Sequence, residues 1–373
     1  MITKKKIKDL SEIRAEHCVS IYIPTYRAGH NQEDLLRAKN AIQKAKVKLE
    51  ERGLSSKEAD RFLRPALQLL KDDTFWLRLS DGLALFISEN TYERFILPHD
   101  VPSFTWVGKK FYLRHLLPAV SGQQRFFLLA LSQNELRFFE GNKHQITPVI
   151  IEDLVPANLE EGLNIDELGN QLQAHSGNGQ NSIFHGHDLG ADHKLKRLES
   201  YLRMIDAGLM EMLHDEQAPL LIAAVDYLVP IYREISGYAY ISDIHISGNP
   251  ENDDPVLLHE KAWNVLSNFQ QNRLDELKDR YQNLLHDRRA SSEPSNVVRA
   301  AEQGKVETLF AAKEKRLFGT FYPEEQAIAW DERKEDLLER AALKTFLQGG
   351  QVFQLSAEAL PDTQSPVSAI MRF

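Results

Sequence analysis

Residues 125–151, RFFLLALSQNELRFFEGNKHQITPVII, are the part of the chain that most restricts its fold. Three apolar runs follow one another, separated by the turn-forming pairs Gln133-Asn134 and Gly141-Asn142. Short apolar runs interrupted by Asn and Gly are typical of consecutive strands joined by tight turns. The stretch therefore predicts three strands in an antiparallel meander.

A long amphipathic helix is predicted after the meander, within ADHKLKRLESYLRMIDAGLMEML. Its apolar residues recur at alternating steps of three and four, the spacing of one helix face, at Leu195, Leu198, Leu202, Ile205, Leu209 and Met212. PLLIAAVD then predicts a strand buried on both faces, and YAYISDIHIS a further strand. Three meander strands, a helix and two strands follow the order of a ribonuclease H-like domain, which we place at residues 109–250.

Residues 1–108 are predicted to form an N-terminal α/β domain. VSIYIPT indicates a strand rich in β-branched residues. Two helices follow: the first ends before Gly53, and the second begins at a pair of capping serines. FWLRLSDGLALFIS predicts a hairpin around Asp81 and Gly82, and YERFILP another strand.

Residues 251–373 are predicted to form a C-terminal α/β/α domain. A long helix begins with Asp254 as its cap and Pro255 in its first turn. A short helix, the strand VETLFAA, a polar insertion (313–333), a helix that ends at Gly349 and two closing strands come after it. Alternating helices and strands imply a small parallel or mixed sheet between helices. The expected fold class is thus α/β (mixed α+β), in three domains.

The length of 373 residues fits two or three domains of roughly 100 to 150 residues each. A hydrophobic share of 42% and a charged share of 27% are typical of soluble globular proteins. We find neither a signal-peptide pattern nor a run of roughly 18 apolar residues, so we expect a cytoplasmic protein. The single cysteine, Cys18, is expected to be a small buried thiol.

The net charge of -9 argues against a surface that is basic throughout. Local basic faces remain: residues 4–8 (KKKIK), and one predicted helix with Lys39, Lys44, Lys46 and Lys48. Another lies on the helix after the meander, with Lys194, Lys196, Arg197 and Arg203. Each is either a solvated face or a set of phosphate contacts. On the last helix, a solvated face would have its charge balanced by Asp192, Glu199 and Asp206.

The segment AHSGNGQNSIFHGH, residues 174–187, holds almost nothing apolar to bury. A structureless loop of this length inside a compact domain is uncommon unless it is functional or disordered. Three interpretations are open: a polar connector, a loop that carries chemistry, or a metal site. A zinc or manganese site would draw its ligands from nitrogen and carboxylate donors, here His175, His185, His187 and His193 with Asp188 or Asp192.

The order of these pieces resembles that of archaeo-eukaryotic peptide chain release factors and of the stalled-ribosome rescue factors Pelota and Dom34. A meander ending in LRFFEG, a glutamine-containing glycine loop, a basic helix and a buried strand are similar to their middle domain. AAEQGKVETLF and the closing strands GGQVFQLS and VSAIMRF are similar to their third domain. VSIYIPTYRAG, FHGHD, GNPE and LHEKAW match the bacterial branch best, and the resemblance covers essentially the whole chain.

The resemblance implies a Gly-Gly-Gln tip that promotes hydrolysis of the peptidyl-tRNA ester on the ribosome. The corresponding string here is GNGQ, formed by Gly177, Asn178, Gly179 and Gln180. A carboxamide and backbone N–H groups can orient water and hold an oxyanion, and glycine permits close approach to RNA. Asn178 replaces the first glycine of the motif, and asparagine enters left-handed conformations more readily than most residues. Gln180 is the candidate catalytic residue.

The candidate RNA contacts are His185, His187, Lys194, Lys196, Arg197 and Arg27. Residues 1–108 contain neither the Asn-Ile-Lys-Ser nor the Tyr-x-Cys-x-x-x-Phe pattern of stop-codon readers, so we expect a codon-independent role such as ribosome rescue. The expected partners are the ribosome and peptidyl-tRNA, with a translational GTPase as a further candidate. We expect a monomer with no membrane contact and no cofactor.

Two other functions stay open. One is a non-catalytic ribosome-binding or regulatory factor with a degenerate loop, and the other is a metal-dependent hydrolase that uses the loop histidines. The chain has no Gly-x-Ser-x-Gly elbow and no phosphate-binding glycine loop with lysine. We therefore expect neither serine-hydrolase chemistry nor nucleotide hydrolysis.

Overall fold

The computed structural model describes residues 2–26, 31–120, 125–156, 158–162, 189–214, 216, 218–331 and 334–373, with the backbone alone at 31 and 189–193. The chain divides into two compact units: unit 1 combines Met1–Gln124 with Arg273–Phe373, and unit 2 is Arg125–Asn272. The domain boundaries at 108 and 250 remain predictions. Within the described ranges, every helix is too short or too polar to span a lipid bilayer.

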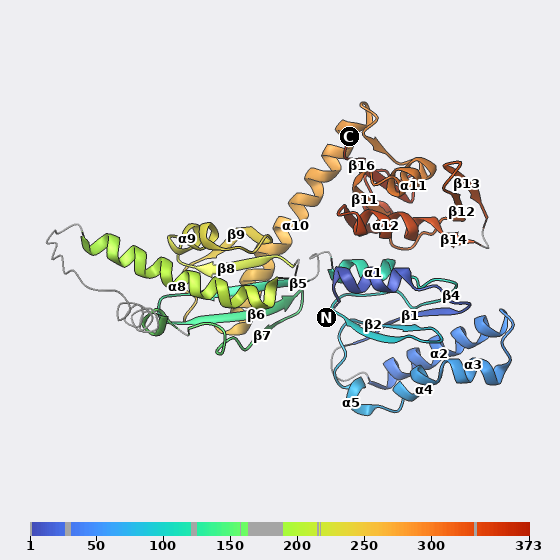
Figure 1. Ribbon diagram of the computed structural model, residues 1–373, viewed down its shortest axis with the longest axis horizontal. Coiled ribbons are helices and arrows are strands. Elements are labelled where there is room, and N and C mark those ends of the chain that lie inside the picture. The colour runs from blue at the N-terminus through green and yellow to red at the C-terminus, as the bar shows by residue number, and fades with distance from the viewer. Residues whose placement is uncertain are drawn as a thin grey trace, which may run out of the picture. The chain divides into compact units, whose positions relative to one another are not determined.

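Unit 2 is built on a five-stranded sheet with the order β7-β6-β5-β8-β9 (Figure 1). β5 (Arg125–Leu131), β6 (Leu136–Asn142) and β7 (Ile146–Pro148) are antiparallel neighbours. β8 (Leu220–Ala224) runs parallel to β5, and β9 (Ile241–Ser247) runs parallel to β8. The predicted meander and the ribonuclease H-like strand order are confirmed.

Both faces of the unit 2 sheet are covered by helices. Phe127, Leu129 and Leu131 of β5 pack on the side of α8 (Leu189–Leu213) and α9 (Leu228–Ile235). The alternate residues Phe126, Leu128 and Ala130 pack against the first turns of α10 (Pro255–Leu285). Since each face of the strand is buried, its sequence is apolar throughout rather than alternating. α9 was not predicted from the sequence.

The N-terminal part of unit 1 is an antiparallel sheet with the order β3-β2-β1-β4. Its strands are β1 (Cys18–Pro24), β2 (Gly82–Ile87), β3 (Tyr92–Leu97) and β4 (Phe104–Gly108). One face packs against α2 (Asn31–Glu50), α3 (Ser56–Phe62) and α4 (Arg64–Leu69). The other face packs against α1 (Lys4–Glu12) and the C-terminal part of unit 1. Cys18 is buried in this core, as predicted.

The hairpin predicted around Asp81 and Gly82 is wrong. The residues before this pair form α5 (Asp73–Trp76), whose first turn is capped by the Asp72 carboxylate, which accepts from the Phe75 N–H at 3.1 Å. The Trp76 indole N–H donates to the Leu69 carbonyl at 2.8 Å. These bonds favour a helical turn, and β2 forms its hairpin with β3 instead.

The C-terminal part of unit 1 is built on the sheet β10-β16-β11-β15. The strands are β10 (Ala290–Ser291), β11 (Val306–Ala312), β15 (Gln351–Leu355) and β16 (Val367–Met371). β11 runs parallel to β15 and antiparallel to β16, so the predicted mixed sheet is confirmed. α11 (Pro294–Glu302) and α12 (Leu337–Leu347) cover one face, and Leu277 and Tyr281 of α10 cover the other.

The polar insertion at 313–333 contributes to a second small sheet. β12 (Phe318–Tyr322) pairs with β13 (Ala327–Trp330) and with β14 (Glu335–Asp336). The short helical turns elsewhere in unit 1 are η1 (Arg114–Leu116), α6 (Leu117–Val120) and η2 (Ala357–Ala359).

Residues 112–114 join the two parts of unit 1 through buried and partly buried polar contacts. The Tyr112 hydroxyl donates to Asp336 Oδ2 at 3.0 Å, and the Leu113 N–H donates to Glu339 Oε1 at 2.6 Å. Arg114, only 1% exposed, donates through Nη2 to the backbone carbonyls of residues 313 and 315, at 3.3 and 2.9 Å. One apolar core runs through both parts. The Tyr112 contact is buried, and the contacts of Leu113 and Arg114 are partly buried at the margin of that core.

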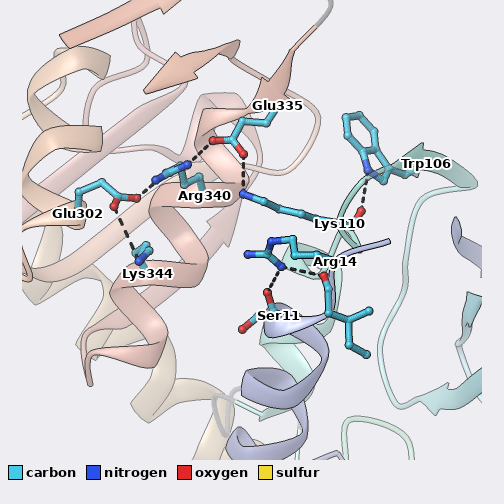
Figure 2. A network of polar contacts seen from close by, with 9 residues as sticks. Ser11, Arg14, Trp106, Lys110, Glu302, Glu335, Arg340 and Lys344 are labelled. Atoms are coloured by element: carbon cyan, nitrogen blue, oxygen red, sulfur yellow. Dashed lines mark hydrogen bonds and ion pairs between the residues drawn. The ribbon is translucent and has the colours of Figure 1, made fainter. Parts of the chain in front are cut away.

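An ion-pair network continues this joint toward the surface (Figure 2). The Lys110 ammonium contacts Glu335 Oε2 at 3.0 Å. Arg340 lies between two carboxylates, contacting Glu335 and, at 2.5 Å, Glu302. Arg340 therefore holds α11 and α12 together, while Lys110 adds a link to the N-terminal part.

Glu339 makes the stability of unit 1 depend on pH. Burial, opposed by the Leu113 N–H, raises its pKa from 4.5 to about 8. A carboxyl group whose pKa is higher in the folded state adds stability below its unfolded pKa and loses it as pH rises through the folded value. Between pH 6.5 and 8.5, urea unfolding should show a loss of roughly 1–2 kcal/mol.

Glu339→Gln is the variant that tests this linkage, because its amide can still accept from Leu113 but does not titrate. The variant should show a flatter dependence of stability on pH over the same window. Burial lowers the pKa of His99 to about 4, so this imidazole is neutral in the folded protein across the window. A slope equal to that of the wild type would contradict the assignment to Glu339.

Candidate functional site

Most of the site residues predicted from the sequence lie outside the described residues. This holds for the GNGQ string (177–180) and for His175, His185, His187, Asp188 and Arg27. Asp192 and His193 belong to the first turns of α8, where only the backbone is described. The described part of the site is α8 itself, which directly follows the glycine- and histidine-rich segment in the sequence.

α8 is anchored on the sheet by its apolar face. Leu198, Tyr201, Leu202, Ile205, Leu209 and Leu213 are buried against the strands of unit 2. At Gly208 the helix backbone approaches the segment before it so closely that a Cβ atom would lie 2.2 Å from the Leu154 carbonyl oxygen. The predicted apolar stripe is confirmed except at its start, because Leu195 is 45% exposed.

Four cations lie on the outer surface of α8. All four are exposed, and within the described residues none of them forms a hydrogen bond or an ion pair with another residue: Lys194, Lys196, Arg197 and Arg203. Lys194, Lys196 and Arg197 are the first cations of α8 whose side chains are described. Unpaired Lys and Arg side chains in this position can bind phosphate oxygens and so fix a neighbouring loop against RNA.

Asp206 does not balance these cations, contrary to the solvated-face interpretation. It lies four residues after Leu202 and three before Leu209, on the inner face of α8, and is 9% exposed. Its carboxylate accepts from the Ser236 hydroxyl at 2.5 Å and the Gly237 N–H at 3.0 Å. The carboxylate therefore secures the end of α9, and the outer face of α8 is more basic than the sequence suggested.

A second polar cluster, which the sequence analysis missed, lies where β8 and β9 end. His245 Nε2 is 3.1 Å from Asp226 Oδ1 and 3.2 Å from Ser247 Oγ. Hydrogen bonds from Ser247 and then His245 lower the pKa of Asp226. The carboxyl ends of parallel strands bring polar side chains together at one edge of a sheet. The polar residues that end PLLIAAVD and ISDIHIS could therefore have predicted this cluster.

This cluster does not form a catalytic triad. In a Ser-His-Asp relay the hydroxyl and the carboxylate bind different imidazole nitrogens, whereas Asp226 and Ser247 both contact Nε2 of His245. Among the described residues there is also no group of three His, Cys, Asp or Glu side chains placed to hold a metal ion. The cluster is therefore a local hydrogen-bonded network at the sheet edge.

Part of the chain matches a known family in sequence. Residues 126–268 match the model of bacterial archaeo-eukaryotic release factor family 7. The match begins in β5 and ends within α10, so it spans the sheet and helices of unit 2. No curated protein matches the chain.

Solved structures of release-factor relatives also match. Saccharomyces cerevisiae Dom34, a translation termination-like factor, is 12% identical over 78% of this chain and 79% of its own, with a TM-score of 0.38. Archaeoglobus fulgidus Pelota is 16% identical over 78% and 79%, with a TM-score of 0.26. The archaeal translation termination factor aRF1 is 15% identical over 100% and 99%, with a TM-score of 0.24.

Proposed function

We propose that the protein is a release-factor-like translation factor that binds the ribosome and promotes hydrolysis of the peptidyl-tRNA ester through Gln180. The observation that carries the proposal is the outer face of α8. There Lys194, Lys196 and Arg197 are exposed on the helix that follows the GNGQ string in the sequence, inside a unit that matches a release factor family. The cations would hold phosphates of ribosomal RNA or tRNA, while the loop carries the chemistry.

In the proposed reaction the loop orients one water molecule. Attack of water on the ester carbonyl produces a tetrahedral oxyanion, which a carboxamide or a backbone N–H can stabilise. Gln180 supplies a donor and an acceptor without a titrating group. Because the first domain lacks the stop-codon-reading patterns, the proposed substrate is a stalled ribosome rather than one halted at a stop codon.

Peptide release from stalled ribosomes tests the proposal. Ribosomes stalled on truncated messenger RNA and carrying labelled peptidyl-tRNA would be mixed with wild-type protein, Gln180→Ala or Ser182→Ala as a matched loop control. We expect release by the wild type and the control, and a loss of roughly 100-fold for Gln180→Ala, the cost of removing one oxyanion donor. A wild type that releases no more peptide than buffer would show that the hydrolase proposal is wrong.

Ribosome binding is measured in the same preparations by cosedimentation at increasing salt. The variant Lys194→Gln/Lys196→Gln/Arg197→Gln should bind more weakly and with a smaller salt dependence, since each phosphate contact releases a counterion. Binding without release would identify a non-catalytic ribosome-binding factor instead. Stoichiometric zinc or manganese in the pure protein, with release abolished by its removal, would favour the metal-dependent alternative.

A further inference from the structure

Unit 1 contains a cluster of cations that lies apart from α8. Of the four lysines predicted on one basic helix, Lys46 is neutralised by Asp60, with 2.7 Å between Nζ and Oδ1. Lys44 and Lys48 have no ion-pair partner among the described residues. The same holds for Arg52, directly after α2, and for Arg316 in the segment between β11 and β12.

Two of these cations are fixed by neighbouring residues of β4. The Lys48 ammonium donates to the backbone carbonyl of Thr105 at 2.7 Å. The Arg316 guanidinium lies over the Phe104 ring, 4.4 Å from its centroid. Cation–π stacking of this kind holds an arginine in place while its N–H groups stay available at the ring edge.

The segment that carries Arg316 is itself clamped. The buried Arg114 guanidinium binds the backbone carbonyls on both sides of residue 314, those of Lys313 and Lys315. The backbone directly before Arg316 is therefore held in place by a buried side chain of unit 1. The cluster therefore depends on contacts from both parts of unit 1, which fix the positions of two of its side chains.

The neighbouring cations act on the Lys48 ammonium. Burial, and after it the Arg316 guanidinium, lowers the pKa of the Lys48 ammonium, and Lys44 and Arg52 act in the same direction. Glu51 is the carboxylate that opposes them. Holding like charges together costs free energy in the free protein, and an anionic ligand would remove that cost.

We propose that unit 1 carries a binding surface for the phosphate backbone of RNA, formed by Lys44, Lys48, Arg52 and Arg316. Lys44 and Lys48 are one helical turn apart, about 6 Å along the axis, so that they can contact successive phosphates of one strand. The aromatic ring beneath Arg316 is buried, with Phe104 only 6% exposed, and cannot stack on a base. The surface would recognise the charge and spacing of the phosphates, and binding would not depend on base sequence.

RNA affinity of the full-length protein tests this surface. Fluorescence anisotropy with a labelled oligouridine of about 20 nucleotides would be recorded between about 50 and 200 mM salt. The cluster variant Lys44→Gln/Lys48→Gln/Arg316→Gln should bind at least roughly 10-fold more weakly at low salt, and its slope of log K against log salt should fall by about 2, or about 0.7 per lost contact.

The matched control removes the same charge elsewhere in unit 1, with Lys57→Gln/Lys71→Gln/Arg78→Gln at exposed positions. It should bind RNA like the wild type, and circular dichroism and urea unfolding should show both variants folded. Equal losses in both variants, no loss in the cluster variant, or binding to anionic vesicles but not to RNA would overturn the proposal. The assay needs neither ribosomes nor Gln180, so its failure is distinct from failure of the proposed peptide release.

Discussion

Gly208→Ala is expected to destabilise unit 2 by at least about 2–3 kcal/mol, the cost of forcing an extra atom into a packed core. The new Cβ atom would lie 2.2 Å from the Leu154 carbonyl oxygen and 2.5 Å from Val155 Cγ1. The Leu154 carbonyl belongs to the backbone and cannot rotate away as a flexible side chain can. The helix α8 must therefore separate from the segment at 151–155. The measurement is urea unfolding of the full-length protein, followed by far-UV circular dichroism.

The sign of this effect separates packing from helix propensity. Alanine is the better helix former by about 1 kcal/mol, so a helix that was loosely packed here would be stabilised by the change. The matched control is Gly237→Ala, where the nearest atom to the new Cβ would be Asp206 Oδ2 at 3.8 Å, an ordinary contact. An unfolding midpoint for Gly208→Ala at or above that of the wild type would contradict the close approach.

Asp336→Ala is expected to destabilise unit 1 by about 3 kcal/mol, because it removes a helix cap and leaves buried donors unsatisfied. The Asp336 carboxylate accepts from the Leu338 N–H at 3.0 Å, the Leu317 N–H at 3.1 Å and the Tyr112 hydroxyl at 3.0 Å. It therefore caps α12, holds the start of β12 and ties both to the N-terminal part of the unit.

Two milder variants separate the contributions of the hydrogen bonds that Asp336 accepts. Tyr112→Phe removes one of the three bonds and should cost about 1 kcal/mol, and Asp336→Asn keeps a capping oxygen and should lie between the two. Units with separate cores are expected to unfold in separate transitions. Asp336→Ala should lower the transition of unit 1 and leave that of unit 2 in place, the reverse of Gly208→Ala. A shift of both transitions by equal amounts would contradict this assignment.

Regular elements with a strong local pattern were predictable from the sequence. The meander, α8 and α10 have periodic apolar residues and recognisable turns or caps, such as Asp254, whose carboxylate accepts from the Leu257 N–H at 2.8 Å. The GNGQ string was found from residue identity and order alone, and its role stays a prediction. The meander and the two helices are local features, so reasoning about neighbouring residues is sufficient to predict them.

Features that depend on distant partners were not predictable. FWL is apolar enough for a strand, but it folds as α5 because the Trp76 indole finds the Leu69 carbonyl. Asp206 looks like a surface charge until the end of α9, itself unpredicted, supplies its donors. The cation cluster of unit 1 joins α2 to Arg316, more than half the chain away, through contacts that neither segment specifies alone.

The interleaved order of the two units has a consequence for synthesis of the chain. The core between the first sheet and α2–α4 uses residues from the first part alone and can close early. The other face of that sheet is buried with residues such as Leu309 and Val367. At roughly 5–20 residues per second, the whole of unit 2 must be made before they emerge, which takes on the order of 10 s.

During that interval the nascent protein carries an uncovered apolar face. A C-terminal part from a neighbouring chain would fit the same face, since the exchanged element is identical. Crowded expression would therefore favour reciprocal exchange between two copies, whereas slow production at low density would favour closure of each chain on itself.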